Sequence, residues 1–118
     1  MIEVSLTLQD RCATRLELQG HASSRGGPLG NNVVCAAVTS LVRSFADALL
    51  EFEQEHGTLG VTGRAERPGE LLIEVKHPDA AAEWLGGATA SVVAGIGRIA
   101  NEYPEEVTFL VQGDQHGS

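Results

Sequence analysis

The sequence predicts an α/β (α+β) fold of two layers, in which two helices cover one face of a five-stranded mixed sheet in the order ββαββαβ. Two observations predict it: stretches in which apolar and polar residues alternate indicate strands, and two longer stretches with apolar residues three and four apart indicate helices. A chain of 118 residues fits one domain. We expect this domain over residues 1–111, followed by a polar, disordered tail over 112–118.

The first two strands are predicted over residues 2–9 and 14–20, where every second side chain is apolar. The segment DRCAT between them would close a hairpin and place Cys12 in the turn. No base and no helix start lies beside Cys12 in the sequence. We therefore expect an unreactive thiol there.

A long helix is predicted over residues 32–55 because one face of it would be apolar. That face consists of Val34, Val38, Leu41, Phe45, Leu49 and Phe52. Either Asn31 or Asn32 can cap the free N–H groups at its start, and Gly57 can end it in a left-handed conformation.

Strands are predicted over residues 58–66, 70–76 and 106–111, on either side of a second helix that Pro78 opens and Pro104 ends. The apolar face of this helix consists of Leu85, Val92, Ile96, Ile99 and Tyr103. Its interior glycines are costly in a helix, at roughly 1 kcal/mol each against alanine, so we expect them to permit close approach of the first helix. They are Gly86, Gly87, Gly95 and Gly97.

Charge and hydropathy narrow the class of protein. The formal net charge is −8, from 16 acidic and 8 basic side chains, which disfavours direct binding of nucleic acid. The sequence has no run of the roughly 20 consecutive apolar residues that a membrane span needs, and it does not open like a signal peptide. We expect a cytoplasmic protein with no membrane partner.

A histidine and a cysteine flank a loop of small residues in the segment GHASSRGGPLGNNVVCAAV, residues 20–38. Cys35 would lie about three residues into the first helix, where free N–H groups and the helix dipole favour a nucleophilic thiolate and an oxyanion. His21 could then act as its general base. From the residues alone, a cysteine in such an apolar segment is more often buried and only packs in the core. Both interpretations, a catalytic cysteine and a buried core cysteine, therefore stay open.

The paired motifs GHA and VCAAV resemble those of the ribosomal-processing cysteine proteases, the Prp family. The resemblance places the catalytic histidine at His21 and the catalytic cysteine at Cys35. The later segment GIGRIANEYPEEV, residues 95–107, also resembles the end of that family's chains. Two positions depart from the family: Asn32 stands where an aspartate is usual, and Thr39 where serine is more usual.

The resemblance implies an endopeptidase that removes an N-terminal extension from a large-subunit ribosomal protein of the L twenty-seven type. It also implies a homodimer. Asn32 would orient the imidazole or cap the helix, without the charge of an aspartate. The loop over residues 22–31 would be a mobile cover for the substrate, through Ser23, Ser24, Gly26, Gly27 and Gly30.

The alternative function is a non-catalytic factor of the same fold that binds or assembles ribosomal components. The four histidines fall on different predicted elements, so we expect neither a metal nor a cofactor. The segment GGPLGN is only a weak phosphate-binding signal, because it lacks the lysine of a P-loop. The acidic segment EFEQEH, residues 51–56, is interpreted as a solvated helix end, with attraction of a basic peptide as a second interpretation.

Overall fold

The computed structural model describes residues 1–20, 29–65, 69–77 and 79–113, with the backbone alone over 29–32. Its elements are β1 (Ile2–Gln9), β2 (Cys12–Gln19), α1 (Leu29–His56), β3 (Gly60–Arg64), β4 (Leu71–Lys76), a 3₁₀ turn η2 (Asp79–Ala81), α2 (Ala82–Glu102) and β5 (Val107–Gly113). The predicted order ββαββαβ is confirmed.

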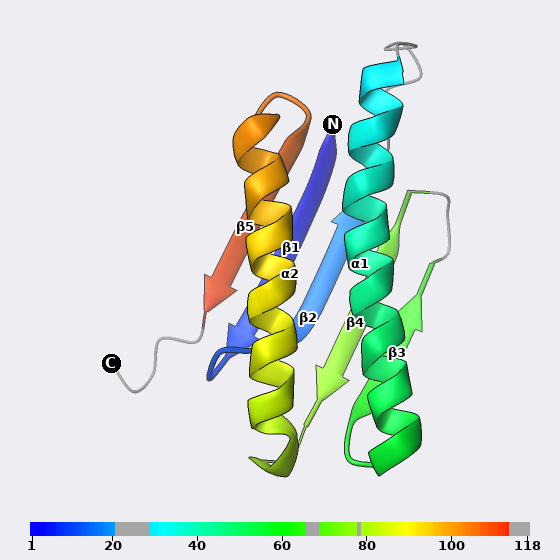
Figure 1. Ribbon diagram of the computed structural model, residues 1–118, viewed down its shortest axis with the longest axis vertical. Helices are drawn as coiled ribbons and strands as arrows, with labels where there is room; N and C mark the ends of the chain where they lie inside the picture. The colour runs from blue at the N-terminus through cyan, green and yellow to red at the C-terminus, as the bar shows by residue number, and fades with distance from the viewer. Residues whose placement is uncertain (21–28, 66–68, 78, 114–118) are drawn as a thin grey trace.

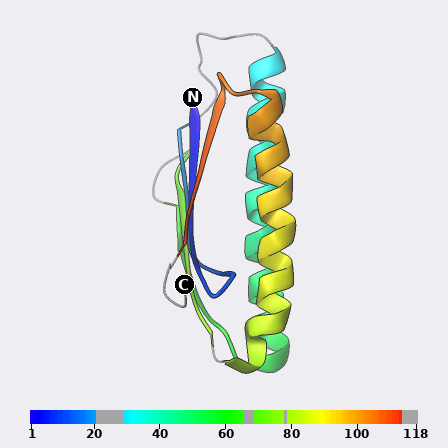
Figure 2. The same ribbon diagram turned by 90° about the vertical axis from the view of Figure 1, so that its left-hand side faces the viewer.

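The five strands form one mixed sheet in the order β3-β4-β2-β1-β5. β5 pairs with β1 in parallel, and the other neighbours are antiparallel. Both helices lie side by side on one face of the sheet (Figure 1), and no helix of the described residues covers the opposite face (Figure 2). The core fills the space between these two layers. Its largest fully buried side chains include Leu6 and Leu16 from the sheet and Leu49, Leu85 and Ile96 from the helices.

The hairpin between β1 and β2 turns more tightly than predicted. Asp10 and Arg11 alone form the turn, and both have positive φ, 53° and 70°. Such a two-residue turn matches the twist of the strands that it joins. Because the turn takes only these two residues, Cys12 begins β2, and the prediction that Cys12 lies in the turn is wrong.

Helix α1 begins at Leu29, three residues before its predicted start. Asn31 and Asn32 are consequently helical residues of its first turn, and the prediction that one of them caps the helix is wrong. The buried face is otherwise close to the predicted one. It consists of Val34, Val38, Val42, Phe45 and Leu49, with Leu41 and Phe52 half-buried at its margins.

Helix α2 follows η2 and ends at Glu102, close to its predicted bounds. Its buried side chains are Leu85, Thr89, Val92 and Ile96, whereas Tyr103 is 45% exposed, contrary to the prediction. Of the four glycines, Gly95 comes closest to α1: a Cβ there would lie 3.1 Å from Leu41 Cδ1. Gly87 and Gly97 would meet nothing within 4 Å, so close packing explains only part of the glycine content.

Strand β5 extends to Gly113, two residues beyond the predicted end of the domain. Its pairing with β1 explains the extension, because Gln112 and Gly113 lie opposite Thr7 and Leu8. The prediction that the tail begins at residue 112 is therefore wrong. Residues 114–118 of that predicted tail lie outside the described residues.

Helix α1 has a further property that was not predicted from the sequence. Between Val33 and His56 it is long and apolar enough, by length and composition alone, to cross a membrane. Core helices of soluble proteins pass the same test. Here the buried residues of α1 belong to the same core as those of the sheet and of α2.

Candidate active site

Cys35 lies in the second turn of α1, at the margin of its buried face. Val34 is 4% exposed and Val38 is fully buried, while Val33 is 64% exposed on the outer side of the helix. Cys35 itself is half-buried, packs against the core and forms no disulfide. The thiol is thus held in place on one side and only partly covered, as a nucleophile must be.

The start of α1 at Leu29 changes the electrostatic argument for Cys35. The free N–H groups of a helix belong to about its first four residues, here residues 29–32, and the effect of the dipole fades within the first turn. Cys35 is the seventh residue, about 9 Å along the axis from the start at 1.5 Å per residue. The prediction that helix N–H groups at Cys35 stabilise a thiolate and an oxyanion is therefore wrong.

Among the described residues, the hydroxyl of Thr39 lies beside the thiol of Cys35. Cys35 Sγ and Thr39 Oγ1 lie 4.0 Å apart, one helical turn from each other. The spacing of four residues in a predicted helix would have indicated this contact. From the sequence, Thr39 was distinguished only as a departure from the family's serine.

Strand β2 leads directly to His21. The strand ends at Gln19, and the following Gly20 has a φ of +94°. A Cβ on Gly20 would overlap the carbonyl oxygen of Met1, so only glycine fits there without a shift. The end of β2 and the start of α1 lie at the same end of the molecule (Figure 1).

His21 itself lies outside the described residues, so its distance to Cys35 is not given by the structure. The predicted loop residues Ser23, Ser24, Gly26 and Gly27 also lie outside them. Gly30 is the exception: it belongs to the first turn of α1, and its assignment to a mobile loop is wrong.

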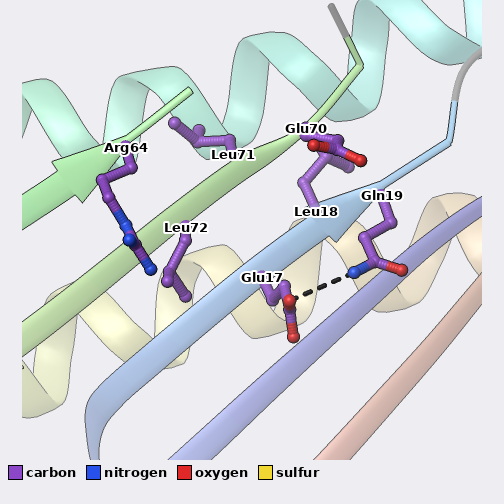
Figure 3. A pocket seen from close by; sticks show the side chains of 7 residues that line it. All are labelled: Glu17, Leu18, Gln19, Arg64, Glu70, Leu71 and Leu72. Carbon is purple, nitrogen blue, oxygen red and sulfur yellow. Dashed lines mark hydrogen bonds between the residues drawn. The ribbon is translucent and has the colours of Figure 1, made fainter. Parts of the chain in front are cut away.

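A small pocket of about 140 Å³ lies at this end of the sheet. Figure 3 views it with the helices behind the strands, and Glu17, Gln19, Arg64 and Leu72 are among its lining residues. Gln19 Nε2 donates a hydrogen bond of 3.1 Å to Glu17 Oε2. The pocket thus adjoins the strand end that precedes His21, and Cys35 is not among its lining residues.

Comparison with known proteins assigns this arrangement to a family. A sequence model of the cysteine protease Prp matches residues 1–108, a range that includes both Cys35 and the segment GHA. The chain belongs to the Prp family. It is accordingly a cysteine protease by family. No curated protein matches the chain.

Solved structures have the same fold as this Prp family member. SMU.848 from Streptococcus mutans is 26% identical, with a TM-score of 0.75 over 97% of this chain and 96% of that one. The essential ribosomal processing protease Prp from S. aureus, in complex with a substrate peptide, is 18% identical. Its TM-score is 0.74, over 95% of this chain and all of that one. The same S. aureus protein with a covalently linked product peptide has a TM-score of 0.71 at 18% identity.

The second cysteine of this Prp protease is placed as an unreactive thiol would be. Cys12 is 1% exposed, and its Sγ donates a hydrogen bond of 3.3 Å to the carbonyl oxygen of Ala82. Burial, and then the nearby Asp10 carboxylate, raise the pKa of Cys12 above its ordinary value of 9.0. Between the two thiols, only Cys35 combines partial exposure with a polar neighbour.

The histidines of the described part of this Prp protease lie apart from the candidate site. His56 ends α1, one residue beyond the predicted end of the helix, and its ring stacks on that of Phe52 with centroids 4.2 Å apart. His77 follows the end of β4. The ends of β4 and α1 both lie at the end of the molecule opposite the start of α1, where Cys35 lies. Within the described ranges, no three His, Cys, Asp or Glu side chains lie close enough to hold a metal ion.

Proposed function

We propose that this chain is an endopeptidase with the Cys35 thiolate as nucleophile and His21 as general base. The observation that carries the proposal is the family match over residues 1–108, which takes in the motifs GHA and VCAAV. The partial exposure of Cys35 beside a fixed helix face supports it. The nearly complete burial of Cys12 removes the other cysteine as a candidate nucleophile.

In this mechanism His21 takes the proton from the Cys35 thiol, and the thiolate attacks the carbonyl carbon of the scissile peptide bond. The C–N bond then breaks, and His21 returns the proton to the leaving amine. The acyl group remains on Cys35 as a thioester. Attack by water on the thioester carbonyl releases the new carboxylate and restores the thiol.

The proposed substrate is the precursor of a large-subunit ribosomal protein of the L twenty-seven type, from which the enzyme removes an N-terminal extension. The similar fold of the S. aureus ribosomal processing protease, solved with a substrate peptide, supports a peptide substrate of this class. With the family resemblance, we propose further that the enzyme acts in the cytoplasm as a homodimer, without binding nucleic acid or membranes.

Asn32 is proposed to orient His21. It lies in α1 three residues before Cys35, and positions three apart share one face of a helix. An amide oxygen can orient an imidazole but cannot stabilise its protonated form by charge. Asn32→Asp is therefore expected to raise kcat several-fold, whereas Asn32→Ala is expected to lower it.

The test is cleavage of a precursor-like peptide, followed by mass spectrometry. Wild-type protein is expected to cut it, and Cys35→Ser and His21→Ala are expected to lose at least about 100-fold in kcat. Cys12→Ser is the matched control and should keep its activity. Cleavage by neither wild type nor variant would favour the alternative, a non-catalytic ribosome-associated factor, for that substrate. Cleavage by Cys35→Ser would place the nucleophile elsewhere.

A further inference from the structure

Cys35 lies on the side of α1 that faces away from α2. Cys35, Val38 and Leu41 follow one another at intervals of three residues, and each such step turns the side chain by about 60° around the helix axis. Leu41 faces α2, because its Cδ1 would lie 3.1 Å from a Cβ on Gly95, and Val38 is fully buried. The step from Val38 to Cys35 therefore leads further away from α2.

Strand β3 lies on that same side of α1. It is the edge strand of the sheet in the order β3-β4-β2-β1-β5. α1 contacts β3, whereas α2 contacts β2 and β5, so each helix covers its own half of the sheet (Figure 1). Within the described residues β3 pairs with β4 alone, which leaves the N–H and C=O groups of its outer edge for pairing with a further strand.

Gly63 in β3 has no explanation in the packing of the described residues. It pairs with Ile73, which is 2% exposed in the core, so a side chain at position 63 would lie on the helix-covered face. Gly63 is nevertheless exposed. Among the described residues a Cβ there would meet only the Leu72 carbonyl oxygen, at an ordinary 3.6 Å.

The backbone does not require glycine at this position either, since the φ of Gly63 is not positive. Glycine is unfavourable within strands, and where it occurs it often marks a place that another backbone or a ligand approaches closely. Gly63 thus indicates that a further chain lies against the outer edge of β3, on the Cys35 side of α1.

We propose that the substrate peptide, beyond the part that lies at Cys35, adds to the outer edge of β3 as an extended strand over Thr62–Arg64. This proposal rests on the proposed protease function. Main-chain hydrogen bonds to β3 hold the peptide whatever its sequence. The room beside Gly63 is filled by a large side chain of the peptide, as large neighbours commonly cover a glycine at a sheet edge.

The spacing between Cys35 and Gly63 defines which part of the peptide binds to β3. Cys35 precedes His56, the end of α1, by 21 residues, which is about 32 Å along the helix axis. β3 begins near that end and runs back along α1, and Gly63 lies about 10 Å along the strand. The remaining distance of about 20 Å corresponds to about six residues of an extended peptide.

The first test is the binding of two fluorescent precursor-like peptides to proteins that all carry Cys35→Ser, so that neither peptide is cut. One peptide extends about ten residues to each side of the scissile bond, and the other only about four, too few to reach Gly63. Gly63→Val is expected to weaken binding of the long peptide about tenfold or more, because it fills the room for the peptide side chain. The short peptide should bind more weakly than the long one, and equally to every variant.

Gly60→Val is the matched control. Gly60 lies in the same strand but pairs with the exposed Lys76, on the face that no described helix covers, so binding of both peptides should be unchanged. Valine favours a strand more than glycine does, and Gly63→Val should therefore be at least as stable as its background in urea denaturation. Weaker binding without weaker folding separates a peptide contact from a structural role.

The second test is N-methylation of the long peptide at successive positions, four to eight residues from the scissile bond, on the side whose truncation weakens binding. Alternate N–H groups of a strand face its neighbour, so methylation should weaken binding at every second position. A uniform effect or no effect overturns the proposal, as does equal binding of the long peptide by Gly63→Val and its background. Because no measurement requires cleavage, failure of the wild type to cut the peptide would remove the protease function and leave the β3 site standing.

Discussion

The backbone N–H of Ala13 donates a hydrogen bond of 3.0 Å to the Oγ1 of Thr89, which joins the start of β2 to the middle of α2. Ala13 is 1% exposed and Thr89 is 2% exposed. Two residues 76 positions apart in the sequence are thus fixed to each other inside the core. The contact holds α2 in register against the hairpin.

Replacement of Thr89 by valine should destabilise the protein through this contact. Valine keeps the shape of the side chain but leaves the Ala13 N–H buried without a partner. The expected loss in the free energy of unfolding is about 1–3 kcal/mol, measured by urea denaturation. Thr89→Ser keeps the hydroxyl and should lose less. Equal stability of Thr89→Val and the wild type would show that the hydrogen bond contributes nothing.

Much of the fold can be predicted from the spacing of apolar residues along the sequence. The buried Thr89 is a residue that this spacing does not predict. Alternation and helical spacing predict the five strands and both helices of the described residues. Thr89 was not predicted in the core, since a polar residue is buried only where a distant partner, here Ala13, satisfies it. The early start of α1 was missed because Gly30, Asn31 and Asn32 are typical of turns and caps.

The candidate site was predictable in part. The motifs located Cys35 and His21, and the spacing of apolar residues placed Cys35 on a helix. The predicted stabilisation of a Cys35 thiolate by helix N–H groups was wrong because it depended on where the helix begins, and helix ends are the least certain part of such a prediction. Gly20 was predicted only as the last residue of the second strand, because neither its positive φ nor its closeness to Met1 can be read from the sequence.

The pH dependence of stability should report the burial of Cys12. Its pKa is raised in the folded state, by burial first and by Asp10 second. As pH rises, the thiol of the unfolded chain ionises before that of the folded chain, so the unfolded state is favoured. The contribution of the Cys12 thiol to the free energy of unfolding is thus complete below its ordinary pKa of 9.0 and is lost as pH rises above that value.

Denaturation between about pH 8 and pH 10 checks this expectation. Cys12→Ala is less stable at every pH because it loses packing, but its stability should fall less steeply over this interval than that of the wild type. Other groups also titrate there, so the difference between the two slopes is the measurement. Identical slopes would contradict a raised pKa for Cys12.

The acidic end of α1 should not contribute to substrate attraction at Cys35. Glu51 lies 16 residues after Cys35 in the same helix, which is about 24 Å at 1.5 Å per residue. That is about three times the screening length of 8 Å at physiological ionic strength. Glu51→Lys with Glu53→Lys should therefore leave the salt dependence of peptide turnover unchanged.

The neutral variant, Glu51→Gln with Glu53→Gln, is the control that separates the loss of the two negative charges from the introduction of two positive charges. If the lysine variant is folded and the salt dependence of its peptide turnover is altered, the basic part of the substrate reaches this end of the molecule. The interpretation of residues 51–56 as a site of peptide attraction would then be correct.

Gly20→Ala should impair both stability and peptide cleavage. Its φ of +94° disfavours any side chain, and the added Cβ would overlap the Met1 carbonyl oxygen, a backbone atom that cannot turn aside. Strand β2 must then shift at the point where it leads to His21. We expect a loss of more than about 2 kcal/mol in the free energy of unfolding, and a lower kcat in the fraction that stays folded.

Gly57→Ala is the matched control for this last variant. Gly57 also has a positive φ, +65°, but a Cβ there would meet nothing within 4 Å. Its expected cost is therefore only the conformational one, about 1 kcal/mol, with kcat unchanged. If the two variants lose the same stability and activity, the contact with Met1 has no effect, and Gly20 serves only as a residue that tolerates a left-handed backbone.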